Sequence, residues 1–191
     1  MGKGRLEAFS DGVIAIIITI MVLEFKRPES VTFAALLPLL PHIAIYALSF
    51  IYVGIYWSNH HHLFHAAKTV TGGILWANLH LLFWLSLLPF VTAWMGENHA
   101  APLPVALYGV VLMMNGLAYN ILSHLLVRHE GAGSVIARAV GKDRKTLLSI
   151  LGYVAAVLIS PFLPALSLGL YAVVALTWLI PDRRIERAMK A

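Results

Sequence analysis

Ser10 and Asp11 are the first residues with distinctive chemistry, and they stand just before an apolar run from Val13 to Leu23. This run of eleven residues is too short to cross about 30 Å of hydrocarbon at about 1.5 Å per residue. A spanning helix must therefore carry Ser10 and Asp11 to membrane depth, where an ionisable group normally faces protein or water. We expect this helix to be interior, screened from lipid by other helices.

The same segment carries a regular stripe. Ile16, Thr19, Ile20 and Leu23 fall at i, i+3, i+4 and i+7, so they share one face of a helix, about 140° away from Asp11. One interpretation is a packing seam between helices. The other is a pore wall, in which Ile and Leu rings form a narrow hydrophobic constriction and Thr supplies oxygen ligands to a cation. Periodicity alone does not choose between them.

A dense histidine cluster follows further along the chain, at positions 60–62 and 65. His61 and His65, four residues apart, have the spacing to bind a transition metal on one helix face. The alternatives are a polar helix end at the membrane interface and modulation by pH. Membrane di-iron enzymes need several such clusters and this chain has one, so we predict no bound metal and no cofactor.

Other chemistry is excluded by what the sequence lacks. There is no cysteine, which rules out disulfides, thiolate metal sites and cysteine nucleophiles. The sequence has no phosphate-binding loop, no nucleotide fingerprint and no complete hydrolase triad. We therefore do not expect an enzyme, and the clustered basic residues are explained by membrane topology without a nucleic-acid partner.

Composition indicates the elements that position these residues. Apolar residues make up 60% of the 191 residues and charged residues 12%, against about 25% charged in soluble domains. A soluble protein of this size leaves roughly a third of its unfolded surface exposed, so the apolar surplus must face lipid. We predict a single all-α transmembrane domain over residues 1–191.

Hydropathy and the positions of helix-breaking proline residues predict six membrane spans. Pro161 and Pro164 indicate a tight turn between the last two. The predicted spans are 5–23, 42–64, 73–95, 103–127, 146–163 and 165–180.

Basic residues test this topology, because cytoplasmic loops are enriched in Lys and Arg. With six spans, Lys26 and Arg27 lie on one side, and the remaining twelve of the 14 basic residues lie on the other. This asymmetry predicts a multi-pass protein of the cell membrane with both termini in the cytoplasm. The twelve are Lys3, Arg5, Lys68, Arg128, Arg138, Lys142, Arg144, Lys145, Arg183, Arg184, Arg187 and Lys190.

The stretch Arg5-x-x-x-Phe9-Ser10-Asp11, with Ile16, Thr19 and Leu23-Glu24 after it, resembles the signature of the transmembrane protein 175 family of cation channels. The resemblance implies a homotetramer in the lipid bilayer, in which four copies of the first helix line a pore for potassium ions. It also implies weak discrimination against sodium. The constriction would correspond to Ile16, followed by Thr19, Ile20 and Leu23.

The resemblance further implies that the Phe-Ser-Asp group forms a buried polar network with the second and third helices. The implied partners are Trp57, Asn78 and either His61 or His62, and Arg5 is expected near an acid at the cytoplasmic face. No Thr-Val-Gly-Tyr-Gly filter is present. We therefore hypothesise that selectivity comes from partial dehydration at the Ile16 ring, helped by Thr19 hydroxyls.

The sequence thus predicts a potassium-selective channel with weak discrimination against sodium. The alternative is a secondary transporter or a proton-permeable carrier. Such a carrier would favour inverted repeats and broken midplane helices, and no internal repeat is evident in this sequence.

Overall fold

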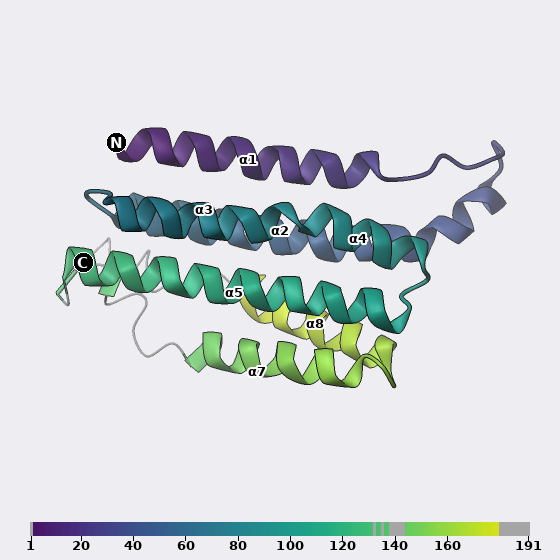
Figure 1. Cartoon of the computed structure of the whole chain (residues 1–191). Helices are drawn as coiled ribbons and strands as arrows, with labels where there is room; N and C mark the ends of the chain where they lie inside the picture. The colour runs from purple at the N-terminus through teal and green to yellow at the C-terminus, as the bar shows by residue number, and fades with distance from the viewer. Residues whose placement is uncertain (1, 132, 135, 138–143, 180–191) are drawn as a thin grey trace.

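The computed structural model describes residues 2–131, 133–134, 136–137 and 144–179, and helices account for most of them (Figure 1). Helices α3 and α4 lie end to end and together make one pass along the bundle. The described helices therefore make six passes along the bundle, in alternating directions. The elements are α1 (Lys3–Leu23), the 3₁₀ helix η1 (Phe33–Leu39), α2 (Leu40–Ala66), α3 (Gly72–Ser86), α4 (Leu88–Glu97), α5 (Pro102–Glu130), α7 (Arg144–Ile159) and α8 (Pro164–Leu179).

This architecture confirms the predicted six-helix fold. Among the described residues, four stretches are long and apolar enough to span a membrane: Lys3–Leu23, Phe33–Ala66, Gly72–Glu97 and Pro102–Glu130. The last two helices, α7 and α8, are apolar but have 16 residues each, which makes them about 24 Å long. The turn between them contains Pro161, and Pro164 begins α8.

The third predicted span is interrupted where it was expected to be continuous. Pro89 occupies the first turn of α4, has no N–H to donate to the carbonyl of Leu85, and would crowd that carbonyl in a continuous helix. The chain turns at Leu87, whose N–H bonds to the carbonyl of Trp84 at 3.2 Å. The Asn115 side chain on α5 donates to the same carbonyl at 3.4 Å. The break is therefore stabilised by a neighbouring helix.

The helices are arranged with α1 at one margin of the bundle and α7 and α8 at the opposite side (Figure 1). Helix α1 packs against α2, α3 and α4, whereas α5 packs against α3, α4, α7 and α8. Within one chain α1 is therefore not the interior helix we expected. The chain covers one face of α1, and screening of the other face requires further molecules.

Tyrosines and a close glycine contact hold the α5–α8 side together. The Tyr171 hydroxyl donates to the carbonyl of Val105 at 3.2 Å, and the Tyr52 hydroxyl donates to the carbonyl of Tyr171 at 2.6 Å. Gly109 lies directly beneath the Tyr171 ring, where any Cβ atom would collide with the Tyr171 hydroxyl. The absence of a side chain at Gly109 is what lets α5 and α8 approach this closely.

The described basic residues follow the predicted asymmetry. Lys3, Arg5, Lys68, Arg128 and Lys145 lie where α1 and α7 begin, in the α2–α3 connection and at the end of α5, all at one end of the bundle. Lys26 and Arg27 follow α1 at the other end. The predictions for Arg138, Lys142, Arg183, Arg184, Arg187 and Lys190 fall outside the described residues.

Candidate ion-conducting site

The two faces of α1 have opposite surroundings. One face is buried against the rest of the chain through Leu6, Ser10, Ile14, Ile17 and Met21. The opposite face carries the predicted stripe, where Ile16 is 58% exposed, Ile20 40% and Leu23 78%. The spacing of residues 6, 10, 14, 17 and 21 places them on one side of a helix, and hydrophobic packing against α2, α3 and α4 fixes that side inward.

Thr19 lies on the exposed face between these apolar residues. Its hydroxyl donates to the carbonyl of Ile16 at 2.9 Å and lies 3.2 Å from the carbonyl of Ala15. Because the hydroxyl proton is directed back at the helix, the oxygen lone pairs are left free to accept from outside the helix. The arrangement presents an oxygen ligand one turn beyond Ile16.

A groove of about 610 Å³ runs along the exposed face of α1. Ile16 and Ile20 border it on the α1 side, and Phe90 and Trp94 of α4 border it on the other. Its walls are mainly apolar, and Glu24 and Glu97 lie at one end. The groove leaves room for another apolar element beside α1.

A polar network joins the buried face of α1 to α2 and α3. The Asn78 Nδ2 group donates to Ser10 Oγ at 2.9 Å, and Ser10 Oγ donates to the carbonyl of Leu6, also at 2.9 Å. Asn78 Oδ1 lies 2.7 Å from His60 Nε2, so the histidine must carry its hydrogen on Nε2. Ser10 and Asn78 are fully buried and His60 is 1% exposed.

This network corrects the expected histidine. Neither His61 nor His62 takes the place that the resemblance implied; His60 does. His61 lies on the exposed side of α2 and stacks on the rings of Trp57 and His65, with centroids 6.3 and 6.0 Å apart. The buried positions of α2, among them Tyr52, Tyr56, His60 and Leu63, follow a helical period that includes position 60 but not 61 or 62. That period is the signal that sequence reasoning missed.

Asp11 is anchored separately from Ser10. It is exposed, and its Oδ1 accepts a hydrogen bond of 3.0 Å from the indole Nε1 of Trp57 on α2. The structure therefore brings Trp57 to Asp11 and Asn78 to Ser10, in two branches on neighbouring faces of α1. An indole donor to a carboxylate is a charge-assisted bond, which is stronger than a bond between neutral groups.

The first turns of α1 carry the remaining signature residues. Phe9 is 53% exposed, and Arg5 is exposed and forms no ion pair among the described residues. Lys3, which sequence reasoning did not select, donates to the carbonyls of Ala67 and His65 at 2.9 and 3.3 Å. These carbonyls belong to the C-terminal end of α2, where a cation is favourable.

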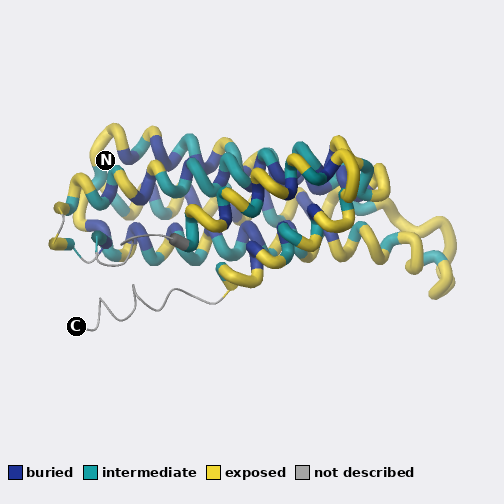
Figure 2. The backbone as a smooth tube through the Cα atoms, turned by 90° about the horizontal axis from the view of Figure 1, so that it is seen from below, coloured by how far each residue is buried: buried dark blue, intermediate teal, exposed yellow. Residues whose placement is uncertain are grey.

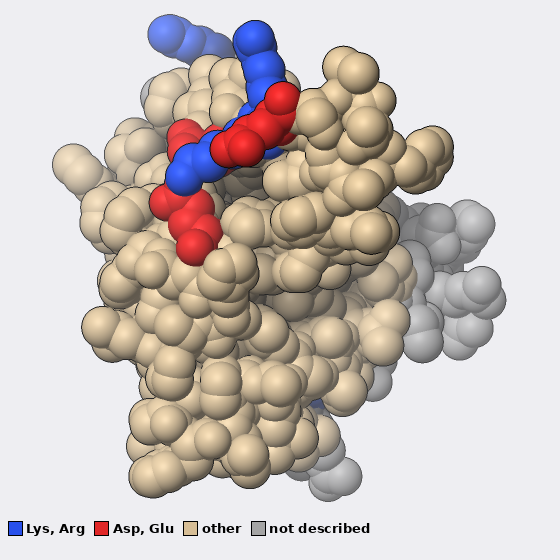
Figure 3. Space-filling view, turned by 90° about the vertical axis from the view of Figure 1, so that its right-hand side faces the viewer, with Lys and Arg blue, Asp and Glu red and all other residues tan. Residues whose placement is uncertain are grey.

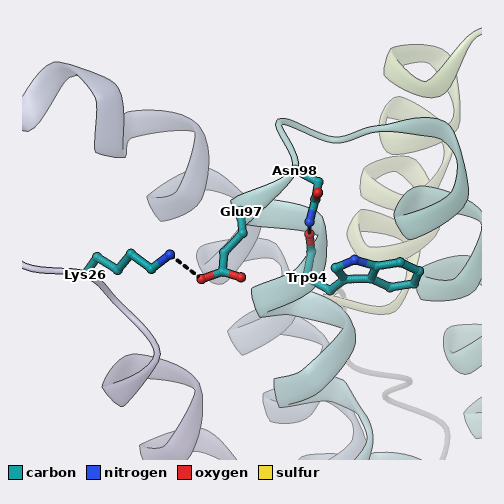
Figure 4. A network of polar contacts seen from close by, with 4 residues as sticks. All are labelled: Lys26, Trp94, Glu97 and Asn98. Carbon is teal, nitrogen blue, oxygen red and sulfur yellow. Dashed lines mark hydrogen bonds and ion pairs between the residues drawn. The ribbon is translucent and has the colours of Figure 1, made fainter.

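The other end of α1 is tied to α4 by an ion pair. Lys26 Nζ lies 2.7 Å from Glu97 Oε1, as Figure 4 shows, and Asn98 Nδ2 donates to the carbonyl of Trp94 beside it. The charged side chains at this end gather on the side where α1 lies, and the rest of the end is uncharged (Figure 3). These charged residues are Glu24, Lys26, Arg27, Glu29 and Glu97.

Metal binding by the histidine cluster finds little support in the geometry. Over the described ranges, no group of three His, Cys, Asp or Glu side chains is arranged to hold a metal ion. His61 and His65 are stacked ring on ring, at an interplanar angle of 23°. Stacked rings do not point their nitrogens at a common point.

Known proteins with similar sequences and structures agree with this geometry. Residues 5–89 match the family model "Endosomal/lysosomal potassium channel TMEM175". A potassium channel of Chryseobacterium sp. (strain P1-3) is 56% identical over 190 residues, which are 100% of this chain and 99% of the relative. An endosomal/lysosomal proton channel TMEM175 of Danio rerio is 37% identical over 81 residues, 36% of this chain and 16% of the relative.

A solved structure gives the same fold. The crystal structure of a lysosomal potassium-selective channel TMEM175 homolog from Chamaesiphon minutus superposes with a TM-score of 0.81 and 28% identity, covering 94% of this chain and 97% of that one. These comparisons confirm the predicted family and the predicted activity, which is ion conduction and not catalysis. With a relative 56% identical over its whole length, the chain belongs to the TMEM175 family of potassium channels.

Proposed function

We propose that four copies of this chain surround a central pore lined by the exposed faces of their α1 helices. The observation that carries the proposal is the position of α1 at the margin of the bundle, with Ile16, Ile20 and Leu23 uncovered. A single helix cannot enclose a pore, so several copies must contribute one each. The apolar groove between α1 and α4 gives a neighbouring helix a place to pack.

Ile16 forms the narrowest ring of this pore and selects potassium by partial dehydration. Potassium gives up its hydration water at a lower free-energy cost than sodium, so a tight apolar ring favours potassium. Thr19 supports this step, because its lone pairs face outward and replace part of the lost water. Ile20 and Leu23 form further apolar narrowings toward the other end of α1.

The buried network positions the pore helix. The contact of Ser10 with Asn78, which His60 holds in turn, and the bond from Trp57 to Asp11 fix the rotation of α1 about its own axis. That rotation determines which residues face the pore. In this role the Phe-Ser-Asp group sets the geometry of the filter without touching the permeant ion.

The orientation follows from charge. The end of the bundle with Lys3, Arg5, Lys68 and Arg128 faces the cytoplasm, and the end with Glu24 and Glu97 faces outward. The chain then lies in the cell membrane with both termini inside.

Flux measurements test the proposal. The purified protein is reconstituted in liposomes, and potassium and sodium efflux are compared for wild type, Ile16→Asn and the matched control Ile121→Asn. Ile121 is exposed to a similar extent, 46%, but lies on α5. We expect Ile16→Asn to raise the flux and reduce the preference for potassium, and Ile121→Asn to leave the preference unchanged. An unchanged preference in Ile16→Asn would remove Ile16 as the filter.

Proton permeation is the second candidate, because the relatives from Danio rerio and Gallus gallus are named proton channels. A pH-sensitive dye inside the same liposomes separates the two ions. Potassium flux without acidification of the liposome interior supports a pathway for potassium alone. Acidification that disappears whenever the potassium flux disappears supports one pore shared by both ions. Flux that requires an opposing ion gradient would instead favour a carrier.

A further inference from the structure

The connection between α1 and α2 carries a run of apolar side chains that no described part of the chain covers. Val31 is 108% exposed and Phe33 88%, and Leu36, Leu37 and Leu40 are exposed as well. No residue of η1 is buried. Figure 2 shows this connection as an exposed projection at the end of the bundle opposite the N-terminus. We name residues 31–37 the outer segment.

The outer segment projects past the Lys26–Glu97 pair, and α2 alone, with 27 residues, is long enough to span a membrane without η1. The charged residues Lys26 and Glu97 mark the membrane interface at this end, since such groups avoid hydrocarbon. At that level α2 has reached its first turns, because the ring of Phe25 packs on Tyr46 with centroids 5.3 Å apart. His42 of α2 lies against Gly96 at the same level.

Everything before Leu40 continues outward from there. The seven residues of η1 add about 14 Å at the rise of a 3₁₀ helix, in the direction that projects past the bundle (Figure 1). Phe33 and Leu37 therefore meet water, not lipid tails, if the chain is alone. Contiguous apolar surface at that depth indicates a protein contact.

The conformation of η1 leads to the same conclusion. 3₁₀ helices longer than three or four residues are uncommon because their hydrogen bonds are poorly aligned. A seven-residue example without a buried side chain has little packing within the chain to stabilise it. A surface that covers Phe33, Leu36 and Leu37 would supply that packing.

We propose that the outer segment packs against a second copy of this chain and forms a collar around the outer mouth of the pore. The inference rests on the proposed assembly around α1. The seven residues from Glu24 to Ser30 connect α1 to the outer segment, so Val31 lies within about 28 Å of Leu23 even if they are fully extended. The exposed stripe of α1 ends at Leu23, the connection at positions 24–29 is charged, and exposed apolar side chains resume at Val31.

Composition favours a second copy over a partner of different chemistry. From Val31 to Leu40 the sequence contains no charged residue. Such a surface is complementary to another apolar surface, and symmetry places an identical outer segment on each neighbour at the same depth. Charged residues gather instead on the pore side of the same end, at positions 24–29 and 97 (Figure 3).

Cross-linking tests the collar cleanly, because the native chain has no cysteine. Leu37→Cys and Phe33→Cys each introduce a single thiol, and membranes containing the full chain are treated with a short bismaleimide. The matched control is Phe162→Cys, which is 82% exposed on the α7–α8 turn at the same end, away from α1. We expect covalent dimers for the two outer-segment variants and monomers for Phe162→Cys.

The result separates the collar from the pore assembly. If Leu37→Cys and Phe33→Cys give no covalent dimers in a preparation whose native mass is that of an oligomer, the collar is overturned and the proposed function is left intact. An entirely monomeric wild type overturns both. Full reaction of the introduced thiols at positions 33 and 37 with a water-soluble or a lipid-confined maleimide also overturns the collar, since water or lipid then covers the segment.

A second variant gives an independent readout. Phe33→Ser combined with Leu37→Ser removes the apolar contact without changing any residue on α1. We expect the oligomeric fraction to fall several-fold on dilution in detergent, whereas Phe162→Ser leaves it unchanged. The potassium preference of the remaining channels stays at the wild-type value. An oligomer as stable as wild type in the double variant contradicts the collar.

Discussion

Helices α1 and α7 each present an apolar stripe to the outside, but the two stripes differ in what interrupts them. The exposed face of α7 carries Leu147, Leu148, Leu151 and Leu158 and turns its Ser149 hydroxyl inward, where it accepts from Trp178 Nε1 at 2.8 Å. The exposed stripe of α1 carries the Thr19 hydroxyl among its apolar residues, bonded only back to its own helix.

This difference supports the proposal that the α7 stripe faces lipid and the α1 stripe faces the pore. Lipid offers no partner to a hydroxyl or a carboxylate, so polar groups on a lipid-facing helix are turned into the bundle, as in α7. Polar groups left on an exposed face indicate water or ions there. Exposure and hydropathy alone would have given α1 and α7 the same assignment.

The largest expected effect comes from the network that fixes α1. Asn78→Leu leaves His60 Nε2 without its acceptor and Ser10 Oγ without its donor. Ser10 keeps its bond to the carbonyl of Leu6, so His60 Nε2 is the group left unpaired, and an unpaired buried polar group costs about 1–3 kcal/mol. We expect destabilisation toward the upper end of that range, about 3 kcal/mol, because Ser10 also loses its second bond. The measurement is thermal unfolding of the detergent-solubilised protein. Asn98→Leu is the control, because Asn98 is exposed and bonds only within its own turn; equal stability of the two variants would contradict the network.

A substitution on the α5–α8 side tests whether that side of the bundle affects stability without affecting ion preference. Gly109→Ala places a Cβ atom against the hydroxyl of Tyr171, and overpacking of this kind costs about 2 kcal/mol. We expect a lower unfolding temperature with an unchanged potassium preference, since this side does not line the proposed pore. Gly169→Ala on α8 meets no atom within 4 Å and should be neutral. A changed ion preference in Gly109→Ala would mean that the α5–α8 side contributes to the filter.

The smallest expected effect concerns the Lys26–Glu97 pair. The two side chains are 78% and 46% exposed, and water and salt screen an exposed ion pair strongly. We expect Glu97→Gln to lower stability only slightly and to remove the salt dependence of that contribution. Exchange of the charges, Lys26→Glu with Glu97→Lys, should restore the salt-dependent part of the stability. A double variant without that salt dependence would show that the ion pair does not hold α1 against α4.

Much of the fold could be predicted because membrane spans follow hydropathy and charge. Turn proline residues indicated the α7–α8 connection in the same way. The interruption at Leu87 could not be predicted from Pro89 alone, because many membrane helices bend at proline without breaking. Here the Asn115 side chain gives the carbonyl of Trp84 a second donor beside the N–H of Leu87, and that contact joins residues 31 positions apart.

The residue types of the candidate site could be predicted from the sequence, but not which of the neighbouring histidines takes part. The partners of Ser10 and Asp11 were expected to be a histidine, an asparagine and a tryptophan. Asn78 bonds to Ser10 and Trp57 to Asp11, whereas the histidine, His60, bonds to Asn78 and to neither of the two. Three consecutive histidines left the choice open, and packing of Tyr52, Tyr56 and Leu63 into the core selects His60. The direction of the Thr19 hydroxyl and the capping of α2 by Lys3 depend on side-chain geometry that a sequence does not encode directly.

Cysteine accessibility tests the central comparison most directly. Ile16→Cys and Leu151→Cys each add one thiol to a chain that has none, and potassium current is recorded while a charged, water-soluble methanethiosulfonate reagent is applied. We predict that Ile16→Cys is modified and its current falls, because position 16 faces an aqueous pore. We predict that Leu151→Cys is unreactive and its current is unchanged, because position 151 faces lipid. Modification at 151 with none at 16, in conducting channels, would contradict the assignment of α1 as the pore helix.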